Sequence, residues 1–552
     1  MISRGSFARA LAAGVALVAT LAWAGGSNAR AAATPIRTLD LSLPGPFNGC
    51  SILDSGATPT TNAILDLIRP SAFLTSQAGN LYGEGGAIAS AELTSLKPET
   101  VVYTLAANQH WSNGDVFDAG DLVAWWQRAR AIASVQSDGY RDIRNVTEST
   151  NGLSLKVVFR QPYAEWNLLF RDVEDTGAPV GCSWSDFLQR PSLGFYKVVV
   201  ASASRIVLVT NPKWATEPGR FQRIVITDAN AFPSSPKALF ASYSLVVDPS
   251  TVGAVSTHLS VLSHIGTSSN IAEVTYSRHS HVTNLLVTRE ALSWFINRQT
   301  LINRIFGAVT FSPSLGQSAL YSQGQSAYPG GNGIGPSGQS TTTIASTGTG
   351  TGTSLADCRL CAIDVLKKAG FVKTAQGWRE PSGVLLSVRM AVGPSSLDRA
   401  AARQVATQWR AEDIGVTEIN AFTDIAAAED AAVGNVDVAV LTRPTTTTAS
   451  YSARSWSGAA YPDSYPSGVR TTTISELYAA GVSNFNPVTA QATWLKLDQV
   501  LLNDFWVRPL FTAPSLVEWS NSIATVYGSL SVQGLVDQVT GWQLATNSYV
   551  GS

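Results

Sequence analysis

A strand, a polar turn and a helix are predicted in close succession in residues 103–129. Tyr103–Leu105 has the pattern of a strand, and Asn113-Gly114 is a strong turn signal. Asp118 then stands at the N-cap position of a helix, with Asp121 in the first turn and an apolar run behind it. A short polar side chain at the N-cap accepts hydrogen bonds from free backbone N–H groups, and an acid in the first turn complements the helix dipole. This stretch therefore constrains the chain to a strand–turn–helix unit.

The first 33 residues have the regions of an export signal. Arg4 and Arg9 give a positive start, residues 11–24 are apolar, and small residues in 29–33 fit an A-x-A cleavage site. The apolar segment is shorter than the roughly 20 residues that a membrane span needs. We expect a signal peptide over 1–33 and a periplasmic, cell-envelope or extracellular protein, with an uncleaved anchor as the alternative. Since the first cysteine is Cys50, a lipid-modified N-terminus is not expected.

The four cysteines fit an exported chain, because oxidising compartments favour disulfide pairing. Of the three possible connectivities we favour Cys50–Cys182 together with Cys358–Cys361. A zinc site would need a second close pair or nearby histidines, and neither is present. A thioredoxin-like redox motif is the other interpretation of Cys358–Cys361, although the surrounding pattern of that fold is lacking.

The composition favours a large solute binder over a nucleic-acid-binding protein. The chain has 552 residues, enough for two or more lobes with separate cores. Charged residues make up 14% and the formal net charge is -1, whereas phosphate binding needs a concentrated basic surface. Most of the 15 tryptophans are expected in cores, with a few available to line a ligand cleft. We therefore expect no nucleic-acid partner.

No motif in the sequence indicates catalysis, a cofactor or a metal. The chain has no G-x-S-x-G elbow, no H-E-x-x-H pair and no Walker-type glycine loop. His279 and His281 could clip a metal, but solvated polar residues are the favoured interpretation. Scattered acids leave a secreted enzyme open, because paired carboxylates can be far apart in sequence. We expect a protein without catalytic residues, cofactor or metal site.

An ordered set of six motifs resembles the family 5 extracellular solute-binding proteins, the peptide-, nickel- and glycoside-type receptors of ABC importers. Two positions depart from the family pattern: Phe195 replaces a proline, and Asn297 replaces an aspartate. Each motif is weak alone, and their order gives the resemblance its specificity. The segments are 103–129, Pro191–Ala215, Val287–Ser314, Ala362–Phe371, Arg399–Val416 and Trp494–Phe511.

The resemblance implies a two-lobed α/β fold of the periplasmic-binding-protein type (class C), with mixed sheets, flanking helices and an extra subdomain in lobe 1. Lobe 1 would comprise 34–286 and 492–552, with the inserted subdomain at about 58–190. Lobe 2 would comprise 287–491. Residues 324–354 are rich in Gly, Ser and Thr and are expected to form a surface loop in lobe 2, with a domain linker as the alternative. Two strands crossing between the lobes would form the hinge.

The function implied is that of a monomeric receptor that captures a peptide, or another polar or amphipathic solute, between its lobes. The receptor would deliver this ligand to the membrane permease of an ABC importer. The alternative is a transport-independent accessory or regulatory protein of the cell envelope that uses the same fold to recognise a glycolipid or a protein partner.

The expected ligand contacts follow from the same resemblance. In peptide-binding relatives an aspartate pairs with the free α-amino group of the peptide, and the matching position here is Ala460, with Asp463 three residues later. A buried ammonium without a partner is costly. Either Asp463 substitutes or the ligand has no free amine, and the aromatic neighbours would also suit a sugar or a lipid-linked glycan. The candidate ligand-binding residues are Trp456, Ala460, Tyr461, Asp463 and Tyr465.

Overall fold

The computed structural model describes the chain between residues 37 and 544, with gaps. The predicted signal peptide (1–33) and nearly all of the predicted loop (324–354) lie outside the described residues. The residues left out are 1–36, 46, 55–56, 77–79, 84, 133–136, 180–181, 215–220, 230–238, 246–260, 308–312, 322, 324–327, 329–354, 420–435, 445–447, 457–470, 525, 527, 530 and 545–552.

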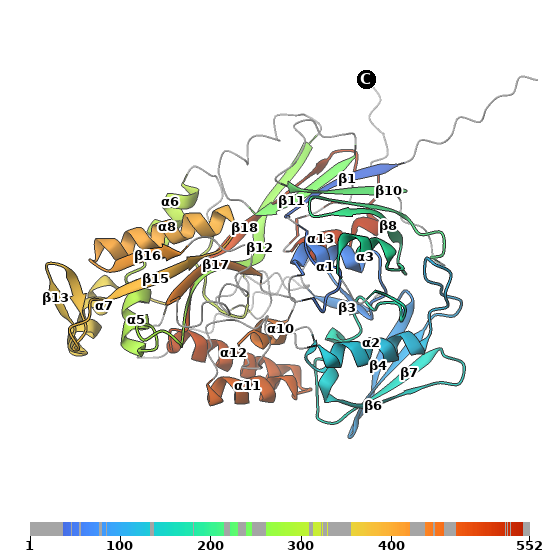
Figure 1. The fold of residues 1–552 in the computed structure, drawn as a ribbon, viewed down its shortest axis with the longest axis horizontal. Coiled ribbons are helices and arrows are strands. Elements are labelled where there is room, and N and C mark those ends of the chain that lie inside the picture. Colours follow the sequence, from blue (N-terminus) through green and yellow to red (C-terminus); the bar gives the residue numbers. More distant parts are fainter. Residues whose placement is uncertain are drawn as a thin grey trace, which may run out of the picture. The chain divides into compact units, whose positions relative to one another are not determined.

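A mixed sheet runs through the described fold (Figure 1). Within the described residues it has ten strands in the order β16-β15-β17-β12-β18-β11-β1-β10-β9-β8. β1 is parallel to both of its neighbours, whereas β18 is antiparallel to β11 and β12. The strands are β1 (Thr38–Leu43), β8 (Tyr196–Ser202), β9 (Arg205–Thr210), β10 (Arg223–Asp228), β11 (Phe240–Leu245), β12 (Val261–Tyr276), β15 (Ser387–Val392), β16 (Gly415–Ile419), β17 (Val438–Pro444) and β18 (Val507–Ser520).

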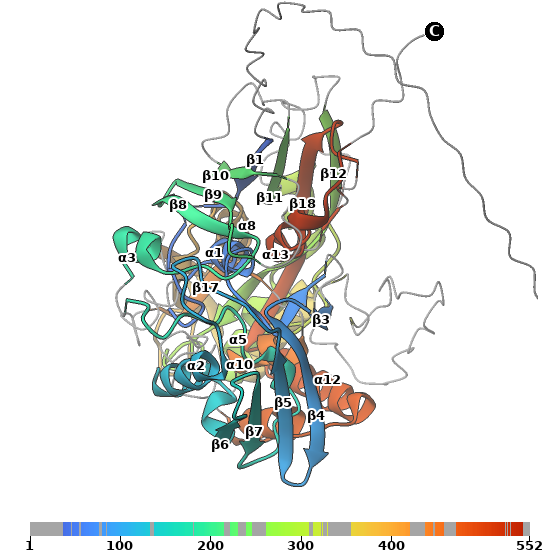
Figure 2. The ribbon, with the colours of Figure 1, turned by 90° about the vertical axis from the view of Figure 1, so that its right-hand side faces the viewer.

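β12 and β18 connect the two halves of this sheet, as Figures 1 and 2 show. β18 also pairs with β11, and β12 also pairs with β17. The two strands pair with each other, but their register shifts between Thr267 and Ile271. At this irregularity the Ser268 hydroxyl donates to the Ala513 carbonyl at 2.6 Å. Because extra residues in one strand bend and twist a ladder locally, this is the candidate hinge.

Separate hydrophobic clusters lie on the two halves of the sheet. On the β1 half, Leu39 and Leu41 are buried in the same cluster as Leu535 and Trp542, so the two ends of the described chain share one core. The helices of this cluster are α1 (Pro59–Asp66), α3 (Trp184–Gln189) and α13 (Val532–Val536). The helices of the other cluster are α5 (Leu286–Trp294), α6 (Arg298–Phe306), α7 (Arg359–Lys368) and α8 (Ser396–Ala411).

A smaller subdomain has its own sheet and core, and is called the β4–β7 subdomain below. In its described part the strand order is β4-β5-β7-β6, and α2 packs on the sheet. The expected strand–turn–helix is confirmed: Asp118 caps α2, and Asp121 completes a capping box while also accepting from Trp111 Nε1 at 3.1 Å. The elements are β4 (Ile88–Leu96), β5 (Glu99–Leu105), α2 (Ala119–Ala131), β6 (Ile143–Glu148) and β7 (Ser154–Phe159).

Helices α10 (Ala449–Arg454), α11 (Thr472–Val482) and α12 (Pro487–Asn503) pack around another apolar cluster. Gly481 lets α11 approach α12 closely, since a Cβ atom there would lie 2.3 Å from the Trp494 ring. The remaining short elements are the hairpins β2 (Phe73–Thr75) with β3 (Leu81–Gly83) and β13 (Val372–Thr374) with β14 (Gly377–Arg379), and the 3₁₀ turns Tyr140–Asp142, Trp166–Leu168 and Val539–Gly541.

The apolar stripe that follows Val287 is divided between two helices, α5 and α6. Asn297 separates the two helices, because its side chain accepts a hydrogen bond from Thr300 N at 2.7 Å and caps α6. A capping interaction of this kind competes with continuation of a helix. Gly370 has the left-handed backbone (φ 84°) that ends α7, and Ile206 and Leu208 of β9 are buried together.

Glu174 is the centre of a buried ionic network next to α1. Arg69 contacts its Oε1 at 2.5 Å, while Arg128 and Arg190 contact its Oε2. Burial opposes ionisation, but the three guanidinium groups hold the pKa of Glu174 below its usual range. Arg69 also donates to the Cys50 carbonyl at 2.7 Å, which links the network to the start of the chain.

We expect Glu174→Gln to reduce the free energy of unfolding by about 3–5 kcal/mol, because it leaves buried guanidinium groups without a countercharge. Glu418→Gln is the matched control, since Glu418 forms an exposed pair with Arg410 at 3.1 Å. Such exposed pairs contribute about 0–1 kcal/mol. Urea denaturation of both variants and the parent measures the difference. Equal midpoints for the two variants would contradict a stabilising role for the network.

Candidate ligand-binding site at the lobe interface

The β4–β7 subdomain contacts helices α10–α12 directly, although the two regions are about 300 residues apart in sequence. The backbone N–H of Ala164 donates to the Val482 carbonyl at 2.5 Å, and the Val482 side chain packs against the core of the subdomain. Figure 1 also shows α11 beside this subdomain. A polar main-chain bond and an apolar contact thus hold the two surfaces together.

A polar group that we call the Arg454 cluster lies at this contact. It consists of Arg454 at the end of α10, Tyr478 of α11, and Asp138 and Tyr163 of the β4–β7 subdomain. The Arg454 guanidinium donates to the Tyr163 hydroxyl and lies 3.7 Å from Asp138 Oδ2, while the Tyr478 hydroxyl donates to the same carboxylate. Burial raises the pKa of both tyrosines well above the usual range, so both remain protonated donors. The cluster joins side chains from both sides of the contact.

Glu165 extends the contact toward the start of α10. Burial raises its pKa, while a hydrogen bond from Ser450 and the charge of Arg454 act in the opposite direction. Ser450 and Arg454 are four residues apart in α10 and therefore lie on one helix face. This face of α10 is directed at the β4–β7 subdomain.

A group of buried aspartates lies close to the same helix, on the side of the main sheet that carries α1 and α13. Arg171 lies 3.5 Å from Asp66 Oδ1. Burial disfavours the charged guanidinium, but Asp66, Asp172 and Asp537 outweigh it and raise the pKa of Arg171. Arg171 therefore offsets the negative charge that gathers at the aspartates.

Burial, followed by the charge of Asp66, raises the pKa of Asp172 and of Asp537 well above the usual range. Asp66 accepts from Gln533 Nε2 at 2.5 Å, and Asp537 accepts from the Thr75 backbone at 3.1 Å. Like charges held this close share protons. Hydrogen bonds to Asp66 favour the protonated forms of Asp172 and Asp537, and Arg171 lies beside Asp66.

The residues expected from the sequence to contact ligand are mostly outside the described part of the chain. Ala460, Tyr461, Asp463 and Tyr465 fall in residues 457–470, which are left out. Trp456 is described and is 1% exposed, packed in the apolar cluster of α10–α12. Its ring therefore belongs to a hydrophobic core in this structure and not to an open surface.

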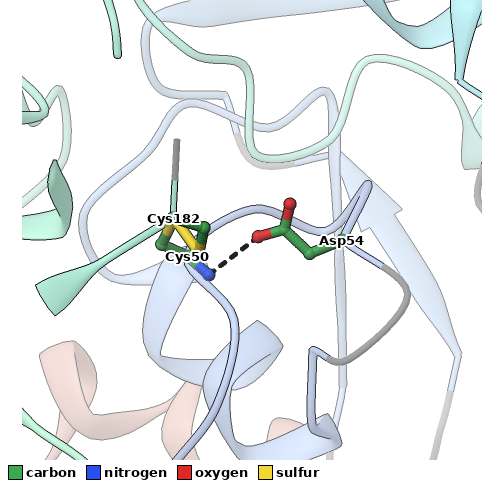
Figure 3. Close-up of side chains that lie close together, drawn as sticks. All are labelled: Cys50, Asp54 and Cys182. Carbon is green, nitrogen blue, oxygen red and sulfur yellow. Dashed lines mark hydrogen bonds between the residues drawn. A yellow bond between two sulfur atoms is a disulfide. The ribbon is translucent and has the colours of Figure 1, made fainter. Parts of the chain in front are cut away.

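The expected disulfide pairs, Cys50–Cys182 and Cys358–Cys361, are both present in the structure. Figure 3 shows Asp54 beside the first, with Oδ2 accepting from Cys50 N at 2.9 Å. A pocket of about 180 Å³ borders this disulfide and is lined by residues that include Asn48 and Trp184. Ligand atoms of Cys50, Asp54 and Cys182 lie within 4.8 Å of one another. Because both sulfurs are bonded to each other, the group is not a metal site in this form.

The family of the chain is shown by comparison with known proteins. The model of the bacterial extracellular solute-binding proteins, family 5 (middle part), matches residues 86–465, which is more than half of the chain. The chain belongs to this family. The resemblance inferred from the six motifs is thus confirmed, and with it the class of solute-binding receptor.

This family 5 protein is similar to one solved structure and to two curated relatives, as follows. The periplasmic EDTA-binding protein EppA has a TM-score of 0.78 at 17% identity, covering 93% of this chain and 98% of its own. The oligopeptide-binding protein OppA of Mycobacterium tuberculosis H37Rv is 28% identical over 210 residues, 35% of each chain. The probable monoacyl phosphatidylinositol tetramannoside-binding protein LpqW of the same strain is 29% identical over 126 residues, 22% of this chain and 20% of its own.

These matches settle the fold and leave the ligand open. The likeness to EppA confirms the two-lobed α/β fold. The regions matched in the two curated relatives span about a third and a fifth of their lengths. Proteins of this family are extracellular, and among the described residues no helix has the length and apolar character to cross a membrane.

Sequence reasoning missed the Arg454 cluster and the three aspartates. Arg454 and Tyr163 are separated by 291 positions, and Asp66 and Gln533 by 467. No local pattern marks these residues, because each is a single polar residue within an ordinary segment. These residues pair because the tertiary fold brings the subdomain next to α10 and the last described helices next to α1.

The raised pKa values of Asp172 and Asp537 predict that the free energy of unfolding falls as pH rises. A raised pKa in the folded state means that the stability contribution is complete below the unfolded pKa of about 3.9 and is lost as pH rises through the folded value. Asp172→Asn keeps a hydrogen-bond donor but cannot ionise. We therefore expect the unfolding free energy of this variant, relative to that of the parent, to increase by more than about 1 kcal/mol as pH rises from 5 to 8.5.

Thermal unfolding at several pH values between 5 and 9 measures this difference. Asp364→Asn is the control, because Asp364 is exposed and pairs with Lys368 on the surface of α7. Parallel profiles for Asp172→Asn and the parent would show that the aspartates do not share protons.

Proposed function

We propose that this protein is an exported receptor that captures a polar or amphipathic solute between its lobes and presents it to the membrane permease of an ABC importer. The family match carries the receptor role. The paired strands β12 and β18, with their register break at Thr267–Ile271, supply a connection about which two lobes can close. We further propose export by the signal peptide over 1–33, action as a monomer, and no catalytic activity.

The proposed lobes follow the sequence-based division. Lobe 1 comprises 34–286 and 492–552, with its inserted subdomain at about 58–190, and lobe 2 comprises 287–491. Separate apolar clusters on the β1 and β15 halves of the sheet support two lobes, as does a further cluster in the β4–β7 subdomain. The ends of β12 and β18, including Tyr276 and Phe511, pack in the β15-half cluster although the division assigns them to lobe 1. Because each lobe has its own core, movement of one lobe relative to the other leaves the packing within each lobe nearly unchanged.

A peptide is the first candidate ligand. The local identity to OppA supports it. Ala460 counts against an ordinary peptide, because alanine cannot pair with the free α-amino group that an aspartate holds in peptide-binding relatives. If the ligand is a peptide, Asp463 is the residue that holds its ammonium group.

A glycolipid is the second candidate, in the alternative role of a transport-independent accessory protein of the cell envelope. The local identity to LpqW supports it. The absence of an aspartate at position 460 also fits a ligand without a free amine. Tyr461 and Tyr465 offer the aromatic faces that a sugar ring or a lipid-linked glycan can stack against.

Calorimetry with a mixed library of di- to pentapeptides separates the two candidates. We expect weak or absent peptide binding by the parent protein. If Asp463 has taken over the ammonium contact, the parent binds tightly and Asp463→Asn loses several kcal/mol of binding free energy, because a buried charge is left unpaired. Glu418→Gln is a surface control for the loss of one carboxylate.

Mass spectrometry of the protein purified without denaturation identifies what it carries from its own cells. A co-purified glycolipid together with no peptide binding supports the accessory role. Tight peptide binding that is lost in Asp463→Asn makes this an ordinary peptide receptor. If small-angle scattering gives the same radius of gyration with and without the identified compound, capture by lobe closure is contradicted.

A further inference from the structure

We infer that Arg454 is a positioning residue that holds the β4–β7 subdomain against α10 and α11 and thereby sets the fraction of closed receptor. This inference rests on the proposed capture of solute between lobes. The contacts that hold the receptor closed, called the latch below, are made by the inserted subdomain and one guanidinium group. The part of lobe 1 that contains the main sheet does not form the latch.

The contacts of Arg454 come from both sides of one interface. Tyr163 and Asp138 belong to the β4–β7 subdomain, and Tyr478 belongs to α11. The Arg454 and Tyr163 side chains are almost completely buried here, and the main-chain bond from Ala164 to Val482 lies alongside. Separation of the two surfaces breaks all of these contacts at once. The contacts of Arg454 therefore exist only when the two surfaces are together.

The chemistry of the cluster suits a reversible latch. Removal of an arginine and an aspartate from water costs solvation free energy that roughly offsets their attraction, so a pair of this kind gives specificity with little net stabilisation. In a separated form Arg454, Asp138 and the two phenols would regain water. The closed form is thus selected by geometry, since the guanidinium must meet Tyr163 and Asp138 together, and the contact can open again.

A second side-chain contact lies on the same face of α10 as Arg454. Ser450, one turn earlier on the same helix, is hydrogen-bonded to Glu165 of the subdomain. This face of α10 therefore meets the subdomain at two points.

The test measures the distance between the two surfaces without any solute. Spin labels are attached to cysteines placed at two exposed positions, Lys156→Cys on β7 and Glu476→Cys on α11. The native cysteines are bonded in pairs and do not react. Pulsed electron spin resonance then gives the populations of short and long label distances in the parent and in latch variants stripped of bound compounds by denaturation and refolding.

We expect Arg454→Met to lower the short-distance population at least fivefold, and Arg454→Lys to recover part of it because the charge is kept. Arg410→Met, which removes an exposed arginine of α8, should leave the distribution unchanged. Since Arg454 is buried, a variant that fails to fold is replaced by Tyr478→Phe, which removes one hydroxyl and should lower the short-distance population at least twofold.

Identical distance distributions in the parent and in the folded Arg454 or Tyr478 variants would overturn the latch. So would a single distance in every variant. Neither result depends on which solute is bound, so failure of the latch is distinguishable from failure of the proposed receptor function. A receptor that binds peptides or glycolipids but shows no variant-dependent distances retains its function and loses this mechanism.

Discussion

The pairing of β12 with β18 is the constraint on which the rest of the structure depends. These strands hold the two halves of the main sheet in register, with β11 bonded to one and β17 to the other. Their register shifts between Thr267 and Ile271 and again between Ala272 and Glu273. Each half of the sheet can therefore keep its own hydrophobic cluster while the connection between them bends. This arrangement separates the requirement for stable cores from the requirement for relative motion.

Buried charges are used in this fold to fix contacts between segments that are distant in sequence. Glu174 joins arginines from three separate segments, Asp66 meets Gln533 near the end of the chain, and Arg454 meets the β4–β7 subdomain. An incorrectly packed arrangement would leave these groups buried without partners, which is costly. Apolar packing supplies most of the stability, and the polar networks determine which surfaces meet.

Local signals in the sequence predicted local structure well. Asp118 and Asp121 cap α2 because a cap depends on the neighbouring residues alone, and the six ordered motifs led to the correct family and fold class. The separation of α5 from α6 is hard to find in the sequence, because the apolar stripe continues through Asn297 and hides the cap. The Arg454 cluster was not predictable, since it depends on how two regions about 300 residues apart are brought together. The ligand residues expected around Ala460 stay a prediction.

The shared core of the two chain ends has a consequence for how the molecule is made. Leu39 and Leu41 are buried with Val517, Leu535 and Trp542, so the core that receives the first strand is completed by the last segments of the chain. Chains emerge with the N-terminus first, and domains usually fold as units. Here the half of the sheet that contains β1 must wait for β18 and α13, while the cluster around α5–α8 is nearly complete earlier. Loss of the C-terminal segment would therefore destabilise the half of the sheet that contains β1. The cluster around α5–α8, which is closer to that segment in sequence, would be affected less.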